Sequence, residues 1–341
     1  MVHLEDLPRG ASVRGILPDG VVAVVDVKRH GLSRATSDRL VSGIVATFCV
    51  LLMLCVTAPS IAKPSQGAVP SSGQTEGQDE CQNTLLSLVG TGFKANQFYD
   101  QLGWCYQRRG EQRKAIEAFK KAIRQYPKEQ SNYLDLITVL SSDRYLDAAL
   151  ELAKQTVAVF PTSSQAYKMQ GLVELMLLMP KNAAASYSRA TQLNPDDPVA
   201  DLGVALAETA SGRVVEAQSA FKNGLKRFSG DPDHYVQYAR FLLKVSDPGD
   251  KATEAHAVQL LRNAVKLNSV LPEPHFLLGK LALRDDNLKE ALKELRMAAQ
   301  LEPDSSKIHF ALARTYRRMK REDEATKEDA MFKKLKKEGN Y

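Results

Sequence analysis

The sequence predicts an all-α fold, a right-handed α-solenoid built from tandem helix-turn-helix repeats. Three ladders of similar residues, all in phase, carry this prediction. Small residues recur in steps of 34 residues, with a single step of 40, at Ala115, Ala149, Ala183, Ala217, Ala257, Ala291 and Ala325. A phenol or imidazole ring recurs in the same phase at Tyr99, Tyr133, Tyr167, Tyr235, His275 and His309. Prolines follow at Pro127, Pro161, Pro195 and Pro303.

The opening unit, residues 96–129, indicates how each repeat packs. Its two predicted helices each carry an apolar face at spacings of three and four residues, formed by Tyr99, Leu102, Gly103, Tyr106, Ala115, Phe119 and Ala122. Gly110 lies between the helices, where glycine adopts a positive φ at little cost. Pro127 prevents the second helix from continuing. Each unit leaves one apolar side open, so we expect the next unit to bury it.

The residues in these slots resemble the tetratricopeptide repeat family. The family's signature slots hold Gly103, Ala115, Phe119 and Pro127 in the first unit, and in the third and sixth units Gly171, Ala183, Tyr187, Pro195, Gly279, Ala291, Leu295 and Pro303. Other units depart from the pattern at Ile137, Ala205 and Asp329. The resemblance covers residues 96–341 and implies seven units, beginning near Asn96, Gln130, Ser164, Pro198, Pro232, Pro272 and Ser306.

The fifth unit is longer than the others because residues 246–251 enlarge the turn between its helices. Such an insertion is tolerated where it does not touch the stacked faces. His275 and His309 lie in the ring ladder, so we expect them to be packing residues. The resemblance implies a scaffold that binds protein partners.

The N-terminal segments predict export. Residues 1–39 form an extension that is basic near its end, and residues 40–62 contain an uncharged apolar run, 40–58, followed by small residues. This order is typical of a secretory signal or of a single transmembrane helix. We expect a chain that is membrane-anchored facing the periplasm or exterior, or secreted or periplasmic after cleavage near Ala62. Residues 63–80 read as a disordered linker and 81–95 as a short capping segment.

The four cysteines do not form a disulfide framework. Cys49 and Cys55 lie in the apolar run, which leaves Cys81 and Cys105 for the folded part. In an exported chain these two could pair. The alternative is that they are two independent small buried residues.

The sequence holds no motif for catalysis or for a cofactor. It contains no GxxxxGK[ST], GxGxxG, HExxH or GxSxG. No Cys or carboxylate cluster stands at metal-ligand spacing beside His234 or His256. We therefore expect no enzyme activity, no cofactor and no metal site. The formal charge of +6 can favour acidic partners or anionic surfaces, but a solvated face with somewhat more Lys than Glu is the preferred explanation.

The predicted partner site is the groove lined by the first helices of successive units. Its side chains should be those one and five residues after each ring of the ladder, with their neighbours. The apolar middle comprises Leu134, Leu172, Met176, Leu202 and Leu206. The aromatic and basic C-terminal end comprises Val236, Arg240, Phe276, Lys280, Phe310, Arg314, Arg317 and Arg318. This combination suits a peptide with acidic residues or a free carboxylate. The alternative is that the leucines belong to the core between repeats.

Two functions from different classes follow. The first is a protein–protein interaction scaffold or adaptor outside the cytoplasm, with unidentified protein or peptide partners and a membrane contact through residues 40–58 if these remain uncleaved. The alternative is an accessory protein that binds an acidic polymer, a polysaccharide or a nucleic acid, through the basic end of the groove. Nucleic acid is the less favoured of these partners.

Overall fold

The computed structural model describes residues 81, 97–247 and 249–338. All regular elements within these residues are helices. They are α3 (Phe98–Arg108), α4 (Gln112–Gln125), α5 (Gln130–Ser142), α6 (Leu146–Val159), α7 (Ser164–Met176), α8 (Pro180–Leu193), α9 (Pro198–Ala210), α10 (Val214–Arg227), α11 (Pro232–Val245), α12 (Lys251–Leu267), α13 (Pro272–Arg284), α14 (Leu288–Leu301), α15 (Ser306–Arg318) and α16 (Glu322–Lys337).

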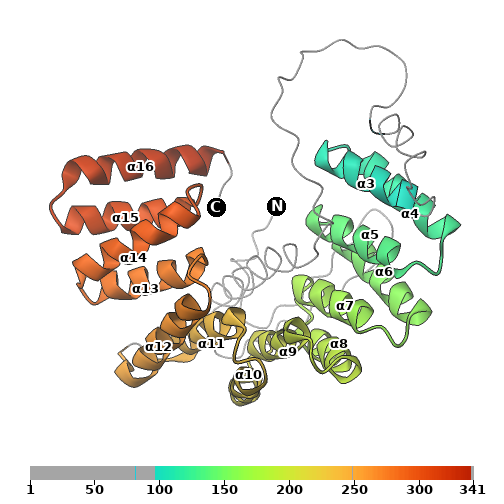
Figure 1. The fold of residues 1–341 in the computed structure, drawn as a ribbon, viewed down its shortest axis with the longest axis horizontal. Coiled ribbons are helices and arrows are strands. Elements are labelled where there is room, and N and C mark those ends of the chain that lie inside the picture. Colours follow the sequence, from blue (N-terminus) through green and yellow to red (C-terminus); the bar gives the residue numbers. More distant parts are fainter. Residues whose placement is uncertain (1–80, 82–96, 248, 339–341) are drawn as a thin grey trace, which may run out of the picture. The chain divides into compact units, whose positions relative to one another are not determined.

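The helices form seven pairs that stack in chain order (Figure 1). Each helix packs against the next along the chain, so every pair covers the apolar side of its predecessor. Several first helices of successive pairs are also in contact: α3 with α5, α5 with α7, α7 with α9, and α13 with α15. This additional contact decides which side chains of the first helices remain accessible.

The predicted signal or transmembrane segment, residues 40–62, and the predicted linker, residues 63–80, lie outside the described residues. The same holds for all of the capping segment 81–95 except Cys81. Among the helices that the structure describes, none has both the length and the apolar character that a membrane span requires.

The small-residue ladder lies where the helices cross most closely. Its seven alanines, from Ala115 to Ala325, are all fully buried. Glycines allow similarly close approaches: a Cβ at Gly103 would lie 2.6 Å from the Phe119 ring. The fully buried ring of Tyr187 lies between two glycines, because a Cβ at Gly171 would be 2.9 Å from it and one at Gly203 only 2.3 Å. Tyr187 therefore fills gaps in its own pair and in the next.

The turns inside the pairs share a left-handed residue, but it is often not glycine. Gly110 has the positive φ that the sequence predicts, at 74°. Leu178 takes φ 60° at the same position of its pair, although a side chain in this region costs free energy. Asp286 also has φ 60°, and its carboxylate is engaged by an arginine of the next pair.

The six extra residues of the fifth pair lie partly in its turn and partly in its two helices. Residues 246–250 separate α11 from α12, whereas residues 177–179 separate α7 from α8. Helix α11 has 14 residues against 13 in α7, and α12 has 17 against 14 in α8. The prediction that the whole insertion enlarges the turn was therefore wrong. Lys251 already begins α12, where the Asp250 side chain caps the helix by accepting from the Thr253 amide.

Candidate functional site

The apolar middle of the predicted groove is interior in the structure. Leu172, Leu202, Leu206 and Val236 expose at most 7% of their surface. For the leucines the cause is simple: α7, which carries Leu172, contacts α5 and α9 as well as α8, and α9, which carries Leu202 and Leu206, contacts α7, α8 and α10. Such side chains stabilise the array and offer a partner very little surface. Leu134 and Met176 are half-buried.

The C-terminal end of the predicted groove is different, because its aromatic rings remain accessible. Phe276 on α13 is half-buried, and Phe310 on α15 exposes 46% of its surface. Each ring carries a cation one helical turn later: Lys280 Nζ lies 5.4 Å from the Phe276 centroid and Arg314 Cζ 5.9 Å from that of Phe310. These are distances at which a ring attracts a cation.

Three further residues join this surface, and the sequence reasoning missed them. Lys307 Nζ, at the start of α15, lies 5.7 Å from the Phe276 centroid and so bridges two pairs. Phe332 on α16 contacts Phe310, with ring centroids 5.3 Å apart, and Lys336 Nζ lies 5.9 Å from the Phe332 centroid. The ring-and-cation spacing at 332 and 336 repeats that at 310 and 314, which is a signal the sequence does contain. We call this surface the aromatic–cation strip: Phe276, Lys280, Lys307, Phe310, Arg314, Phe332 and Lys336.

The other predicted basic residues are engaged in ion pairs with the array itself. Arg240 on α11 pairs with Glu273 at 2.8 Å. Arg317 pairs with Asp329 at 2.5 Å, and Arg318 pairs with Asp286 at 2.6 Å. Each contact joins two different elements of the array, so we assign the three arginines first to stabilising the architecture.

The cations of the strip lack such carboxylates. Within residues 97–247 and 249–338, no ion pair involves Lys280, Lys307, Arg314 or Lys336. A ligand with carboxylates would complete this part of the surface.

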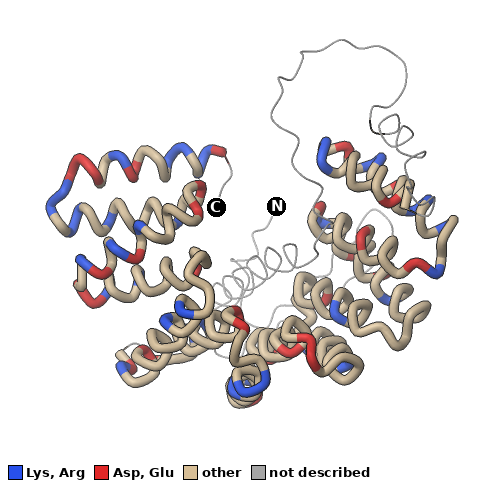
Figure 2. Tube along the Cα trace, viewed as in Figure 1, with Lys and Arg blue, Asp and Glu red and all other residues tan. Residues whose placement is uncertain are grey.

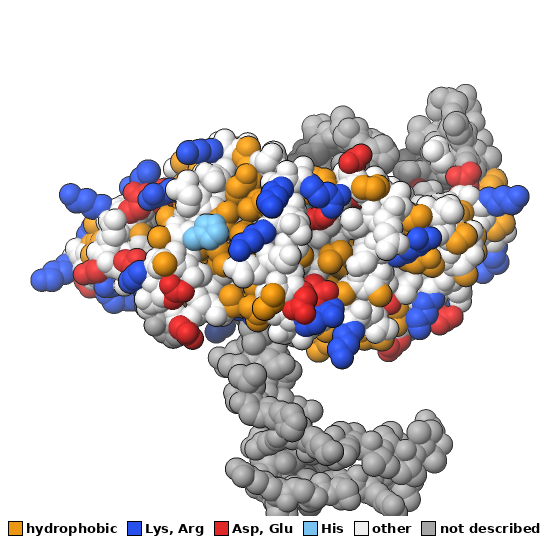
Figure 3. Space-filling view, turned by 90° about the horizontal axis from the view of Figure 1, so that it is seen from below, with side chains coloured by type: hydrophobic (Ala, Val, Ile, Leu, Met, Phe, Trp, Pro, Cys, Tyr) orange, Lys and Arg blue, Asp and Glu red, His pale blue; other side chains and the backbone are white. Residues whose placement is uncertain are grey.

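The net positive charge of the chain is concentrated in its last helix pair. Residues 306–337 hold 11 Lys or Arg against 5 Asp or Glu, an excess of six that equals the formal +6 of the whole chain. Figure 2 shows Lys and Arg recurring along both α15 and α16. By contrast, the face seen in Figure 3 intersperses both signs of charge with hydrophobic side chains. Five of the seven strip residues, all except Phe276 and Lys280, lie in this basic pair.

Buried imidazole–carboxylate pairs hold the two helix pairs that carry the strip. His275 Nδ1 lies 2.6 Å from Glu294 Oε2, and its Nε2 lies 3.3 Å from the Ser269 carbonyl oxygen. Both neighbours are acceptors, so an imidazolium that donates from both nitrogens fits best. The hydrogen bond to Glu294 raises the pKa of His275, and the same bond lowers the pKa of Glu294.

His309 repeats this arrangement in the last pair. Its Nδ1 lies 2.6 Å from Glu328 and its Nε2 lies 2.7 Å from the Pro303 carbonyl oxygen. Tyr133 donates to the equivalent carbonyl of Pro127 at 3.1 Å, six residues before it in the chain. The two histidines thus make the same hydrogen bond as the tyrosine, to the carbonyl oxygen six residues earlier in the preceding turn. They are packing residues, as the ladder predicts.

An acidic pair lies on the first helices at the other end of the array. Burial and the hydrogen-bonded Asp100 carboxyl raise the pKa of Asp135 to about 8. Trp104 also hydrogen-bonds Asp135, and this opposes the shift. A shared proton accounts for the close approach of the two carboxyls. The part of the chain that the structure describes holds no group of three or more His, Cys, Asp or Glu residues that could bind a metal ion.

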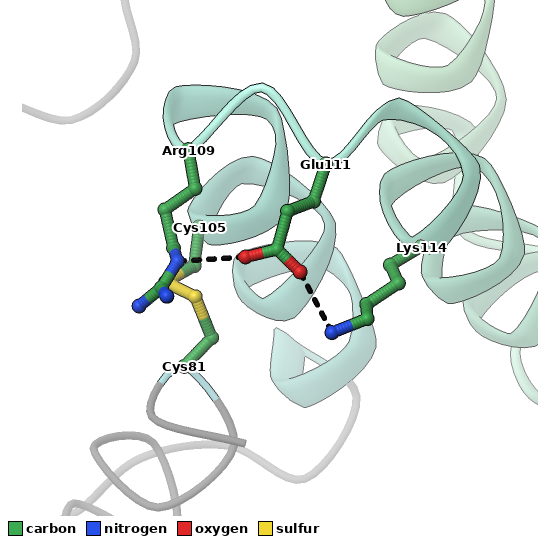
Figure 4. The surroundings of a disulfide bond; sticks show 5 residues. All are labelled: Cys81, Cys105, Arg109, Glu111 and Lys114. Carbon is green, nitrogen blue, oxygen red and sulfur yellow. Dashed lines mark hydrogen bonds and ion pairs between the residues drawn. A yellow bond between two sulfur atoms is a disulfide. The ribbon is translucent and has the colours of Figure 1, made fainter. Parts of the chain in front are cut away.

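A disulfide ties the segment before the array to its first helix (Figure 4). Cys81 and Cys105 have Cα atoms 5.9 Å apart, and Cys81 is almost fully buried. Beside them Glu111 pairs with Arg109 at 2.8 Å and with Lys114 at 2.7 Å. Of the two readings that the sequence left open, the structure contains the bonded pair.

Comparison with known families fits this architecture. Residues 97–129 match the family model described as Tetratricopeptide repeat. The opening pair is a tetratricopeptide repeat, and the array has the fold of that family. The matched segment is the opening helix pair, α3 and α4, and the six pairs after it repeat its geometry. Residues 3–36 match a second model, described as Domain of unknown function (DUF8742), and lie outside the described residues.

A solved structure extends the likeness to most of the array. A tetratricopeptide repeat protein from Parabacteroides merdae ATCC 43184 superposes with a TM-score of 0.54 and 17% identity, over 69% of this chain and 90% of that one. This likeness concerns the fold. Cellulose synthase operon protein C of Pseudomonas fluorescens (strain SBW25) is 28% identical over 136 residues, and human Protein O-mannosyl-transferase TMTC3 is 25% identical over 203 residues. These matches cover 38% and 59% of this chain but only 10% and 22% of the two relatives.

Proposed function

We propose that this protein is an interaction scaffold outside the cytoplasm, which binds a protein partner on helices α13, α15 and α16 of its last two pairs. Arrays of this family generally mediate protein–protein interactions, and they are generally not enzymes. The observation that carries the proposal is the accessible row of Phe276, Phe310 and Phe332. Accessible aromatic rings are typical anchors of protein interfaces.

Two observations support a setting outside the cytoplasm. The sequence places a basic patch directly before the uncharged run 40–58, which is the order of an export signal. A disulfide between Cys81 and Cys105 persists most readily in an oxidising compartment. One relative is named for a cellulose synthase operon, and a role beside such an assembly agrees with this setting. Fractionation of the host that recovers the mature chain in the cytoplasm, with residues 40–58 intact, would overturn this part of the proposal.

The scaffold function is tested by affinity capture from the native host. The variant Phe276→Ala/Phe310→Ala removes two anchors, and Val215→Ala/Val270→Ala is the matched control, because those valines are 76% and 66% exposed elsewhere on the array. We expect the first variant to lose specific partners that the wild type and the control both retain. An unchanged set of captured proteins would refute a site on these rings. The buried Leu172 and Leu206 are unsuitable for this test, because charges there would unfold the array.

The alternative function, binding of an acidic polymer, is favoured by one observation, the concentration of charge in residues 306–337. Binding dominated by charge weakens steeply with added salt. A polymer-binding protein would therefore release a polyuronate or an oligonucleotide when the salt is raised from low to moderate concentration. Replacing Phe276 and Phe310 would leave this binding unchanged.

A further inference from the structure

We infer that the aromatic–cation strip binds an acidic segment of a partner protein, whose carboxylates bond the cations held over the three phenylalanine rings. This inference rests on the proposed scaffold function and adds the chemical class of the partner. It adds the cations Lys307 and Lys336 to the binding residues, one at the start of α15 and one on α16.

The first argument is that these cations are positioned in advance. Lys280, Arg314 and Lys336 each lie over the ring that precedes them by four residues, at 5.4 to 5.9 Å from its centroid. Residues at this spacing are neighbours on one face of a helix. A ring restricts where the long side chain can go, so less entropy is lost when a carboxylate binds. The ammonium and guanidinium groups of the strip are therefore oriented hydrogen-bond donors, whereas exposed lysines without a ring are free to move.

The second argument is the contrast with neighbouring cations. Arg317 and Arg318 come from the same helix as Arg314, and both are neutralised by carboxylates of the array. Arg314 and the three lysines of the strip have no such carboxylate among the described residues. Carboxylates of the array therefore pair with the arginines that connect its elements, and in the part of the chain that the structure describes they do not pair with the cations of the strip. Charge complementarity then points to a ligand that brings its own carboxylates.

The third argument separates a peptide from a nucleic acid. Single-stranded nucleic acids stack their bases on the faces of aromatic side chains. In the strip those faces already carry cations, with both Lys280 and Lys307 over Phe276. A base would have to displace a cation from each ring that it used. Carboxylates can reach the same cations from outside while apolar side chains of the peptide contact the ring edges, as at the exposed Phe310.

The repeat also sets a spacing for the ligand. Helices α13 and α15 are in contact, and packed helices lie about 8–10 Å apart. An extended peptide advances about 3.3 Å per residue. Acidic residues three positions apart would therefore match Lys280 on one helix and Arg314 on the next.

The test uses the full chain and a synthetic peptide of about twelve residues with Glu at every third position and Leu between, compared with the same peptide carrying Gln. Binding is measured by fluorescence anisotropy at low and moderate salt. The strip variant replaces its four cations: Lys280→Gln, Lys307→Gln, Arg314→Gln and Lys336→Gln. The control has the same net charge but loses four exposed lysines of the second helices α6, α8 and α10: Lys154→Gln, Lys181→Gln, Lys222→Gln and Lys226→Gln.

We expect the Glu peptide to bind at least about tenfold more tightly than the Gln peptide, and the strip variant to lose this preference while the control keeps it. Equal binding of both peptides, or no binding of the Glu peptide at about 1 mM, overturns the inference. An equal loss of the Glu preference in the control variant also overturns the inference, as does tighter binding of oligothymidylate than of the Glu peptide. If the Glu preference is absent while capture of native partners still depends on Phe276 and Phe310, the scaffold function stands and only the acidic class is wrong.

Discussion

The pair formed by His275 and Glu294 predicts how the stability of the array depends on pH. The folded state raises the pKa of His275, because Glu294 accepts a hydrogen bond from its imidazole. The pair therefore stabilises the fold fully below the ordinary imidazole pKa, and this contribution is lost as the pH rises through the folded-state value. The pKa of Glu294 is lowered for the same reason, so its contribution is lost on strong acidification. The pair should help most in mildly acidic to neutral solution.

The magnitude follows from the burial of the pair. Only 8% of the His275 side chain and 10% of the Glu294 side chain are exposed. Removing one partner of such a buried pair costs about 3–5 kcal/mol. Because Lys293 also reaches Glu294, at 3.4 Å, we expect Glu294→Ala to cost about 3 kcal/mol at pH 6 and clearly less at pH 9.

The assay is urea unfolding of the full chain at both pH values, followed by circular dichroism. Hydrogen exchange of residues 272–301 then localises the effect, since repeat arrays need not unfold in one step. The double variant His275→Tyr/Glu294→Gln is the matched control, because Tyr133 and Tyr235 make the same turn contact without a charge. The free energy of unfolding of the wild type should exceed that of the double variant by a margin that grows as the pH falls from 9 to 6. A constant difference between them would refute the reasoning.

Three further predictions concern other parts of the array. Reduction of the Cys81–Cys105 disulfide, whose cysteines are 24 residues apart, should lower the free energy of unfolding by about 3.5 kcal/mol, measured by urea unfolding with and without reductant; no change would show that the bridge does not constrain the unfolded chain. Asp135→Asn should raise stability at pH 9 by at least about 1 kcal/mol, because the ionised carboxylate beside Asp100 is unfavourable there, and the gain should vanish near pH 4. Leu178→Gly should raise the melting temperature through about 0.5–1 kcal/mol, because glycine relieves the positive φ; a fall would show that the leucine is held by contacts not apparent in its 55% exposed side chain.

The sequence predicts the helices well because their causes are local and periodic. After the first pair, the expected starts at Gln130, Ser164, Pro198, Pro232, Pro272 and Ser306 coincide with the first residues of α5, α7, α9, α11, α13 and α15. The ring ladder identified His275 and His309 as packing residues, but it did not indicate their glutamates, which lie 19 residues further along in the second helix. Periodicity gives the face on which a side chain lies. It does not give that side chain's polar partner.

The candidate site was harder to predict because accessibility depends on the neighbouring pair. Leu172 and Phe310 occupy equivalent predicted faces, yet the first is 7% exposed and the second 46%. The first helix of the following pair contacts Leu172's helix, whereas α15 has no later pair within the described residues. Likewise Arg318 and Arg314 look alike in sequence, and only the structure shows that Asp286 of the preceding pair neutralises Arg318.

Tyr187 has a consequence for how the array can be divided. The family's repeat is counted from α7 to α8, but this ring sits against Gly171 of its own pair and, more tightly, against Gly203 of the next. A segment cut at the conventional boundary, before α9, would leave the ring without half of its surroundings and Gly203 with an empty space. The natural piece to transplant or delete is therefore offset by one helix and consists of α8 together with α9. Recombination and truncation that respect this shifted frame should preserve folding better than those that follow the sequence repeat.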